Sequence, residues 1–351
     1  MLFKLAIFSS LVFLIIELKG TNHKKSKVLA FIPLVIVFII VGFNRMNNDY
    51  VNYKVIFENN GYQLEFGYKS LIKILKILGQ EHETIVFLIG SLLVLVFIKM
   101  MKNNKHINVM IFLYCIFPLV YDINQIRNLL MYLIVILSLK FIRKKSMIRY
   151  YIGIFLAYSF HTLGLVYIPL YHLCQIDRKK FIKIIWSLLC FITIISPIVI
   201  NLLSKIFPYK MEAYLSGQKS GRGIIVIVVY VIVDIFTVWW VDKKINKKLN
   251  YEEKKEMEVL YRFVWYSILI LPFTFYFMEI QRLQRNTLLV KYYYCALAMN
   301  HLKRTEKIIT LILLLISVTL PILLMMYSSQ MYLFDYLDKN FIIDYLKANF
   351  G

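Results

Sequence analysis

The chain has 351 residues, of which 60% are hydrophobic, and its mean hydropathy is +0.66. Soluble domains average about 45–50% apolar residues, so this composition excludes an ordinary soluble globular protein. The formal net charge of +22 lies mostly in short loops between apolar runs. Its expected partners are therefore anionic membrane lipids and not nucleic acid.

Apolar runs long enough to cross a hydrocarbon core as helices recur along the chain. The first run resembles a signal peptide, but it lacks a strong basic n-region and a small-residue cleavage site, so we expect it to be retained. The two short runs beside His161 either cross the membrane or form a re-entrant pair near 150–175. We expect a single all-α transmembrane domain over residues 1–351, a polytopic helical bundle with about twelve spans: 3–18, 27–43, 83–101, 107–121, 127–142, 149–161, 162–175, 183–203, 224–241, 259–277, 284–300 and 308–327.

The loops alternate in charge, which predicts the orientation. Strongly basic loops such as "KFIRKKSMIR" and "DKKINKKLNYEEKKE" are expected on the cytoplasmic side. Both termini then face outward. The external side receives segments 44–82, 122–126, 204–223, 278–283 and 328–351, and loops 44–82 and 204–223 are expected to contribute to a site.

Polar side chains that need an explanation gather on this predicted external face. Arginine is a planar, permanently charged donor that suits phosphate oxygens. Carboxylates and a histidine can move protons, and tyrosine rings can stack on sugars. The set therefore points to a substrate with a diphosphate, a glycan and a lipid tail. Its members are Arg45, Asp49, Tyr50, Tyr53, Glu65, Tyr68, Gln125, Arg127, His161, Arg222, Glu279, Arg282 and Arg285.

Each of these residues also has an ordinary structural explanation. Arg127 can extend to the outer headgroups, as arginines near helix ends do. His161 can be a core histidine, and Asp49 and Glu65 can be solvated loop acids. Arg222, between two glycines, can mark a flexible loop tip. Only their occurrence together on one face favours a site.

Four strings, in this order, resemble the EpsG/Wzy-like family of bacterial polysaccharide polymerases. They are "NRMNNDYVNYKVIF…LEFGYKSLIKIL", "QIRNLLMYLIVILSLKFIRKK", "YSFHTLGLVYIPLY" and "EIQRLQRN". The resemblance covers roughly residues 40–290. Two departures stand out: Asn128 follows the arginine where the family has glutamine, and no aromatic pair follows the last arginines. Either Arg282 or Arg285 is then the counterpart of the late family arginine.

The resemblance implies a GT-C-like fold and the polymerisation of repeat units carried on undecaprenyl diphosphate. Donor and acceptor would both be lipid-linked oligosaccharides. It implies no cofactor and no metal, and admits a chain-length regulator as a partner. The implied location is the bacterial plasma membrane, with the site facing outward.

Such a transfer needs cations at the leaving diphosphate and activation of the acceptor hydroxyl. We assign Arg127 and Arg282 to the diphosphate, with Arg285 and Arg222 as further candidates. Activation falls to His161, Asp49 or Glu65, which the sequence does not separate. The remaining members are assigned to the glycan: Arg45, Tyr50, Tyr53, Tyr68, Gln125 and Glu279.

Two other functions fit the same ligand. A flippase for lipid-linked glycans would need charges along a path reachable from both leaflets, whereas here they lie on one predicted face. An O-antigen ligase would have a large external loop late in the chain, whereas here the long external loop comes early. The sugars, the linkage and the stereochemistry cannot be read from the sequence.

Overall fold

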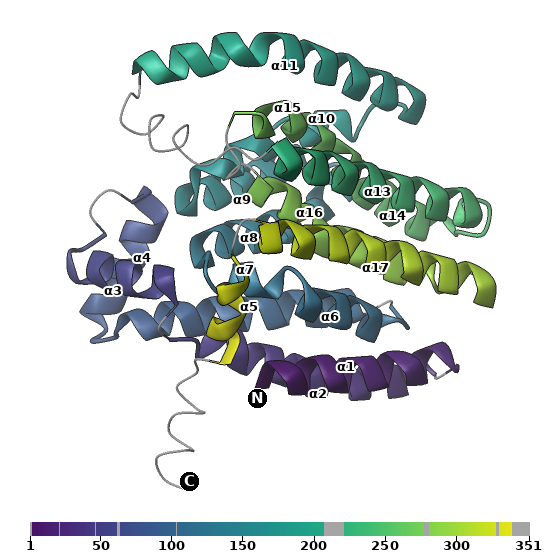
Figure 1. Ribbon diagram of the computed structural model, residues 1–351, viewed down its shortest axis with the longest axis horizontal. Coiled ribbons are helices and arrows are strands. Elements are labelled where there is room, and N and C mark those ends of the chain that lie inside the picture. Colours follow the sequence, from purple (N-terminus) through teal and green to yellow (C-terminus); the bar gives the residue numbers. More distant parts are fainter. Residues whose placement is uncertain are drawn as a thin grey trace, which may run out of the picture. The chain divides into compact units, whose positions relative to one another are not determined.

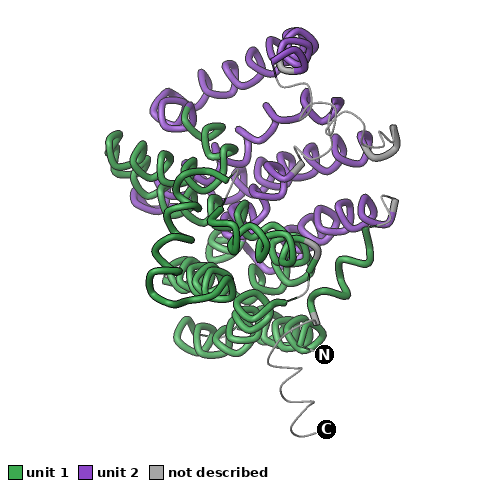
Figure 2. The backbone as a smooth tube through the Cα atoms, turned by 90° about the vertical axis from the view of Figure 1, so that its left-hand side faces the viewer, with its two compact units in different colours: residues 1–168, 296–301, 330–351 green, residues 169–295, 302–329 purple. Residues whose placement is uncertain are grey.

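The structure is a computed structural model. It describes residues 2–338 except residues 21, 46, 62–63, 103, 207–220, 277–280 and 328–329. The described residues form helices and turns without a β-strand (Figure 1), which confirms the predicted all-α class. The chain divides into two compact units (Figure 2). The expectation of one transmembrane domain over 1–351 stays a prediction.

The first unit comprises residues 1–168, 296–301 and 330–351. Its long helices pack as neighbours, α2 against α1 and α5, α1 against α6, and α8 against both α5 and α9. Its elements are α1 Leu2–Leu18, α2 His23–Gly42, α3 Asn48–Glu58, α4 Phe66–Ile77, α5 His82–Met101, α6 Ile107–Ile116, α7 Leu119–Asp122, α8 Ile126–Arg143, α9 Met147–Phe160, and the 3-10 helices η1 Thr162–Tyr167 and η4 Met331–Asp338.

A buried carboxylate ties α1, α2 and α6 together. Glu17, near the end of α1, accepts from the backbone N–H of Asn108 at 3.1 Å and from the Asn108 side chain at 2.6 Å. It also accepts from the hydroxyl of Ser26 in α2. The negative group thus lies at the N-terminus of α6, where backbone N–H groups lack partners within the helix.

Two glycines let α9 approach its neighbours closely. A Cβ on Gly153 would overlap the side chain of Ser138 in α8, and a Cβ on Gly67 of α4 would lie 2.8 Å from the carbonyl oxygen of Ser159. Because only a hydrogen occupies the space, α4 packs onto the end of α9. That contact lies two residues before His161.

The second unit comprises residues 169–295 and 302–329. Within it α13 packs against α17 and α14, and α11 packs against η2 and α15. Its elements are α10 Leu170–Leu173, α11 Arg178–Ile206, α13 Gly221–Ile245, α14 Tyr251–Tyr266, η2 Ser267–Ile270, α15 Leu271–Thr274, α16 Gln281–Ala298 and α17 Arg304–Tyr327. The last three residues of α16 belong to the first unit.

Buried ions join three helices of the second unit. Lys291 on α16 donates to Asp234 on α13 and to the hydroxyl of Ser317 on α17, and the lysine is fully buried. Asp234 also accepts from Ser317 at 2.5 Å. The Lys291 ammonium lies 5.2 Å from the centre of the Tyr292 ring. A paired charge of this kind is compatible with an apolar interior, whereas an isolated one is not.

Six helical stretches of the described chain are long and apolar enough to cross a membrane, namely His23–Gly42, His82–Met101, Arg178–Ile206, Ile224–Ile245, Tyr251–Thr274 and Arg304–Met326. The predicted count of about twelve spans is therefore not supported. Several predicted spans correspond to shorter helices: α1 has 17 residues, α9 has 14 and α6 has 10. Helix α6 ends at Ile116 because Phe117, the residue before Pro118, adopts an extended backbone, which a following proline favours.

The predicted span 162–175 is not one helix. It consists of η1 and α10, and η1 packs back against α9. The chain thus turns sharply at His161, whose backbone is extended between the two elements. The expected re-entrant pair near 150–175 stays a prediction.

Candidate functional site

Arg127 lies in the first turn of α8 and contacts two side chains of the same unit. Its Nε donates to the Tyr53 hydroxyl at 2.9 Å, and its Nη1 donates to Glu65 Oε2 at 2.5 Å. The guanidinium carbon lies 5.5 Å from the centre of the Tyr53 ring. These bonds use two of the five guanidinium N–H groups. The arginine is held in place and keeps donors for a ligand.

Glu65 connects this arginine to the turn at His161. It precedes α4, and while one carboxylate oxygen accepts from Arg127, the other accepts from the backbone N–H of Thr162 at 3.3 Å. The side chains of Glu65 and Arg127 are only 17% and 18% exposed, so the pair is partly shielded from water. Charge-assisted bonds in such surroundings are stronger than at an open surface.

His161 has a constrained imidazole. Its Nδ1 accepts from the backbone N–H of Leu163 at 3.2 Å and thereby caps η1. A neutral ring that accepts at Nδ1 carries its proton at Nε2. In this tautomer Nε2 is a donor, which suits binding an oxygen atom better than removing a proton from one.

Further aromatic rings lie beside Tyr53. The Tyr53 ring lies 6.1 Å from Tyr68 and 6.5 Å from His82, nearly parallel to the latter. Tyr50, one helical turn before Tyr53, donates to Glu83. Burial, followed by the hydrogen bond and charge of Glu83, raises the pKa of Tyr50, and burial raises the pKa of Tyr68. Both phenols are therefore neutral donors at physiological pH.

The structure brings together one part of the predicted set. Arg127, Glu65, Tyr53, Tyr68 and the His161 turn form one cluster in the first unit. Asp49 is half-buried in the first turn of α3, Gln125 directly precedes α8, and Arg45 lies after α2.

The remaining predicted residues lie elsewhere in the chain. Arg282 and Arg285 are on α16 of the second unit, and Arg285 is 7% exposed. The side chain of Arg222 and all of Glu279 fall outside the described residues.

Two residues near the cluster were missed by the sequence analysis. His82 and Glu83 open α5, and their roles depend on rings and hydroxyls contributed by α3. An acidic residue in the first turn of an apolar helix is common, because it complements the helix dipole. No sequence signal distinguished Glu83 from that ordinary case.

The described residues offer no group of three or more His, Cys, Asp or Glu side chains that could hold a metal ion. The expectation that the protein works without metal or cofactor stays a prediction. The donors and acceptors of the cluster are those that bind phosphate and hydroxyl groups directly.

The fold and the cluster define a multi-pass helical membrane protein with a shielded arginine–carboxylate pair beside a histidine turn. The chain belongs to the EpsG family, whose model matches residues 6–338, nearly its whole length. This membership makes it a membrane protein of polysaccharide biosynthesis and confirms the family predicted from the sequence. No curated protein and no solved structure matches the chain.

Proposed function

We propose that the protein polymerises oligosaccharide repeat units carried on undecaprenyl diphosphate, at the outer face of the bacterial plasma membrane. The observation that carries this proposal is the partly shielded Arg127, held by Tyr53 and Glu65 next to the His161 turn. Family membership supports the pathway. What we propose beyond the family is the polymerase activity, undecaprenyl diphosphate as the lipid carrier, and the outward-facing position of the site.

The chemistry follows from the groups present. The acceptor hydroxyl oxygen attacks the anomeric carbon of the donor sugar, a glycosidic bond forms, and the bond from that carbon to the diphosphate oxygen breaks. Negative charge grows on the leaving diphosphate, where the remaining N–H groups of Arg127 can bind it. The hydroxyl proton passes to a base. Because His161 Nδ1 already accepts a backbone N–H, we assign this role to Glu65 in preference, with Asp49 as the alternative.

Bidentate binding separates arginine from lysine, since lysine keeps the charge and loses the planar fork. A deletion strain complemented with Arg127→Lys should therefore lose long polysaccharide and keep single repeat units. Arg143→Lys, at the other end of the same helix, is the matched control and should restore the full ladder. The measurement is a gel of surface glycans together with immunoblotting of the membrane fraction.

The same strains distinguish the other functions. If the protein were a flippase, deletion would remove even single repeat units from the surface. If it were a ligase, long glycans would accumulate on the lipid carrier without reaching their final acceptor. A full ladder with Arg127→Lys would instead support the ordinary explanation, in which the arginine serves the membrane interface.

A further inference from the structure

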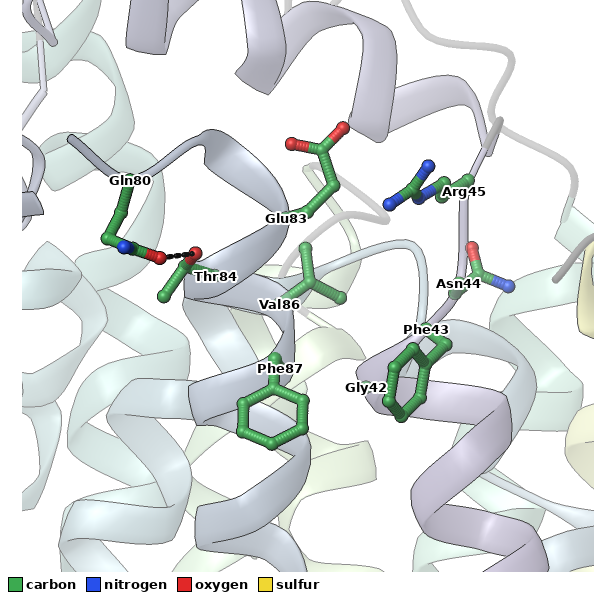
Figure 3. Close-up of a pocket in the computed structure, with 9 residues that line it drawn as sticks. All are labelled: Gly42, Phe43, Asn44, Arg45, Gln80, Glu83, Thr84, Val86 and Phe87. Atoms are coloured by element: carbon green, nitrogen blue, oxygen red, sulfur yellow. Dashed lines mark hydrogen bonds between the residues drawn. The ribbon is translucent and has the colours of Figure 1, made fainter. Parts of the chain in front are cut away.

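A pocket of about 360 Å³ lies in the first unit between the end of α2 and the start of α5 (Figure 3). This volume falls in the range of small-molecule sites, which are mostly apolar with a few placed polar groups. The lining residues are Gly42, Phe43, Asn44, Arg45, Gln80, Glu83, Thr84, Val86 and Phe87.

One side of the pocket is aromatic. The rings of Phe43 and Phe87 lie 5.7 Å apart edge to face, and Phe38 contacts both, at 5.7 Å and 5.4 Å. Edge-to-face packing of three rings fixes their positions. The rings of Phe43 and Phe87 thus give the pocket a rigid apolar wall, to which the C–H face of a sugar ring can pack.

The opposite side is polar and carries both signs of charge. In Figure 3 the Glu83 carboxylate and the Arg45 guanidinium lie above the two phenylalanines. Thr84 donates to the Gln80 side-chain oxygen at 3.1 Å, and the Gln80 amide supplies N–H donors. An anionic headgroup is not the expected ligand, because the Glu83 carboxylate would repel it. A carboxylate, an amide, a hydroxyl and a guanidinium together match the alternating donors and acceptors of a polyhydroxylated ring.

Glu83 retains capacity to accept. Its Oε1 accepts from the Tyr50 hydroxyl and lies 3.8 Å from Lys54 Nζ. Its Oε2 is buried and has no hydrogen-bond partner among the described residues. An unsatisfied buried acceptor is unfavourable, and a hydroxyl of a ligand that reaches it would satisfy it.

Helix α3 links the pocket to the arginine cluster. Tyr50 donates to Glu83 in the pocket wall, and Tyr53, three residues later, accepts from Arg127. Residues three apart on a helix are neighbours, with Cβ atoms about 5–6 Å apart. The pocket and the arginine cluster are therefore connected through neighbouring side chains of one helix.

We propose that this pocket is a subsite for one pyranose ring of the repeat unit, with Glu83 as its principal hydroxyl acceptor. The proposal rests on the proposed function, because it takes the substrate to be a glycan. In this proposal Glu83, Gln80 and Thr84 bind a sugar ring of the substrate. The diphosphate is bound elsewhere, at Arg127.

The test uses the oligosaccharide released by mild acid from the host's lipid-linked pool, with its reducing-end phosphate removed. Binding to the full chain in nanodiscs is followed by saturation-transfer NMR and calorimetry. Glu83→Gln should weaken binding about tenfold or more, because a charged acceptor is lost. Glu81→Gln removes the same charge one residue outside the α5 helix and should leave binding unchanged.

A second variant guards against misfolding of the first. Thr84→Trp fills the pocket from its exposed rim and should abolish binding while the protein keeps its thermal transition. The subsite is overturned if the oligosaccharide fails to bind the wild-type protein, or if Glu83→Gln and Glu81→Gln bind it equally well. Failure of the proposed function has a different signature: the oligosaccharide binds in a Glu83-dependent way, yet deletion of the gene leaves the glycan ladder intact.

Discussion

Arg127 and Glu65 form an ion pair with 2.5 Å between Nη1 and Oε2, although 62 residues separate them in the chain. The second oxygen of Glu65 is bonded to the backbone beyond His161. One carboxylate thus holds the start of α8, the start of α4 and the turn after α9 in register. A substitution at Glu65 therefore affects the packing of all three segments.

We predict that Glu65→Gln lowers the rate of chain extension by about a hundredfold or more, the lower end of general-base effects. Glutamine keeps the shape, but it removes the charge and cannot take up a proton. The rate is measured with purified lipid-linked donor and acceptor. Glu58→Gln on neighbouring α3 is the control, and near-wild-type turnover by Glu65→Gln would transfer the role of base to Asp49.

His161 is predicted to be a positioning residue. Its Nδ1 accepts a backbone N–H two residues on, a bond that an asparagine side chain can also make. His161→Asn should therefore keep most of the activity, whereas His161→Ala, which loses the cap, should lower both activity and thermal stability. His172→Asn serves as control. If His161→Asn instead lost activity about a hundredfold with unchanged stability, the imidazole would be the general base.

The sequence predicted several helices closely and others poorly, for physical reasons. Uninterrupted apolar runs gave spans 27–43 and 83–101, and the helices are His23–Gly42 and His82–Met101. The run 107–121 looked equally apolar, yet the backbone of Phe117, before Pro118, is extended and ends the helix at Ile116. Hydropathy sums over a window and is insensitive to such a local break.

The site shows a similar division. Arg127 could be singled out because a charge beside a long apolar run is costly and needs a reason, whereas Glu65 was included only as a member of the polar set on the predicted external face. Their pairing could not be predicted, since it depends on how α4 packs on α9 at Gly67. Glu83 could not be singled out at all, because its significance comes from Tyr50 and the neighbouring pocket.

The Lys291–Asp234 pair of the second unit should be structural. Lys291→Met leaves a buried carboxylate without its counter-ion, which costs about 3–5 kcal/mol, whereas replacing both partners by apolar residues is often neutral. We predict a marked loss of thermal stability in detergent for Lys291→Met and recovery in Lys291→Met with Asp234→Leu. Lys255→Met, which breaks an exposed pair with Glu252, should have little effect. Equal stability of the single and double variants would contradict the role of the pair.

The orientation of the protein decides whether the arginine cluster can meet an external glycan. Asn59 is exposed at the end of α3, the helix that carries Tyr53, and Lys247 is exposed in the basic segment after α13. Basic loops are retained on the cytoplasmic side. In a background without the four native cysteines, a cysteine replacing Asn59 should therefore react with an impermeant thiol reagent added to intact spheroplasts. A cysteine replacing Lys247 should react only after permeabilisation, and the reverse pattern would place Arg127 inside the cell and remove the basis for an external polymerase.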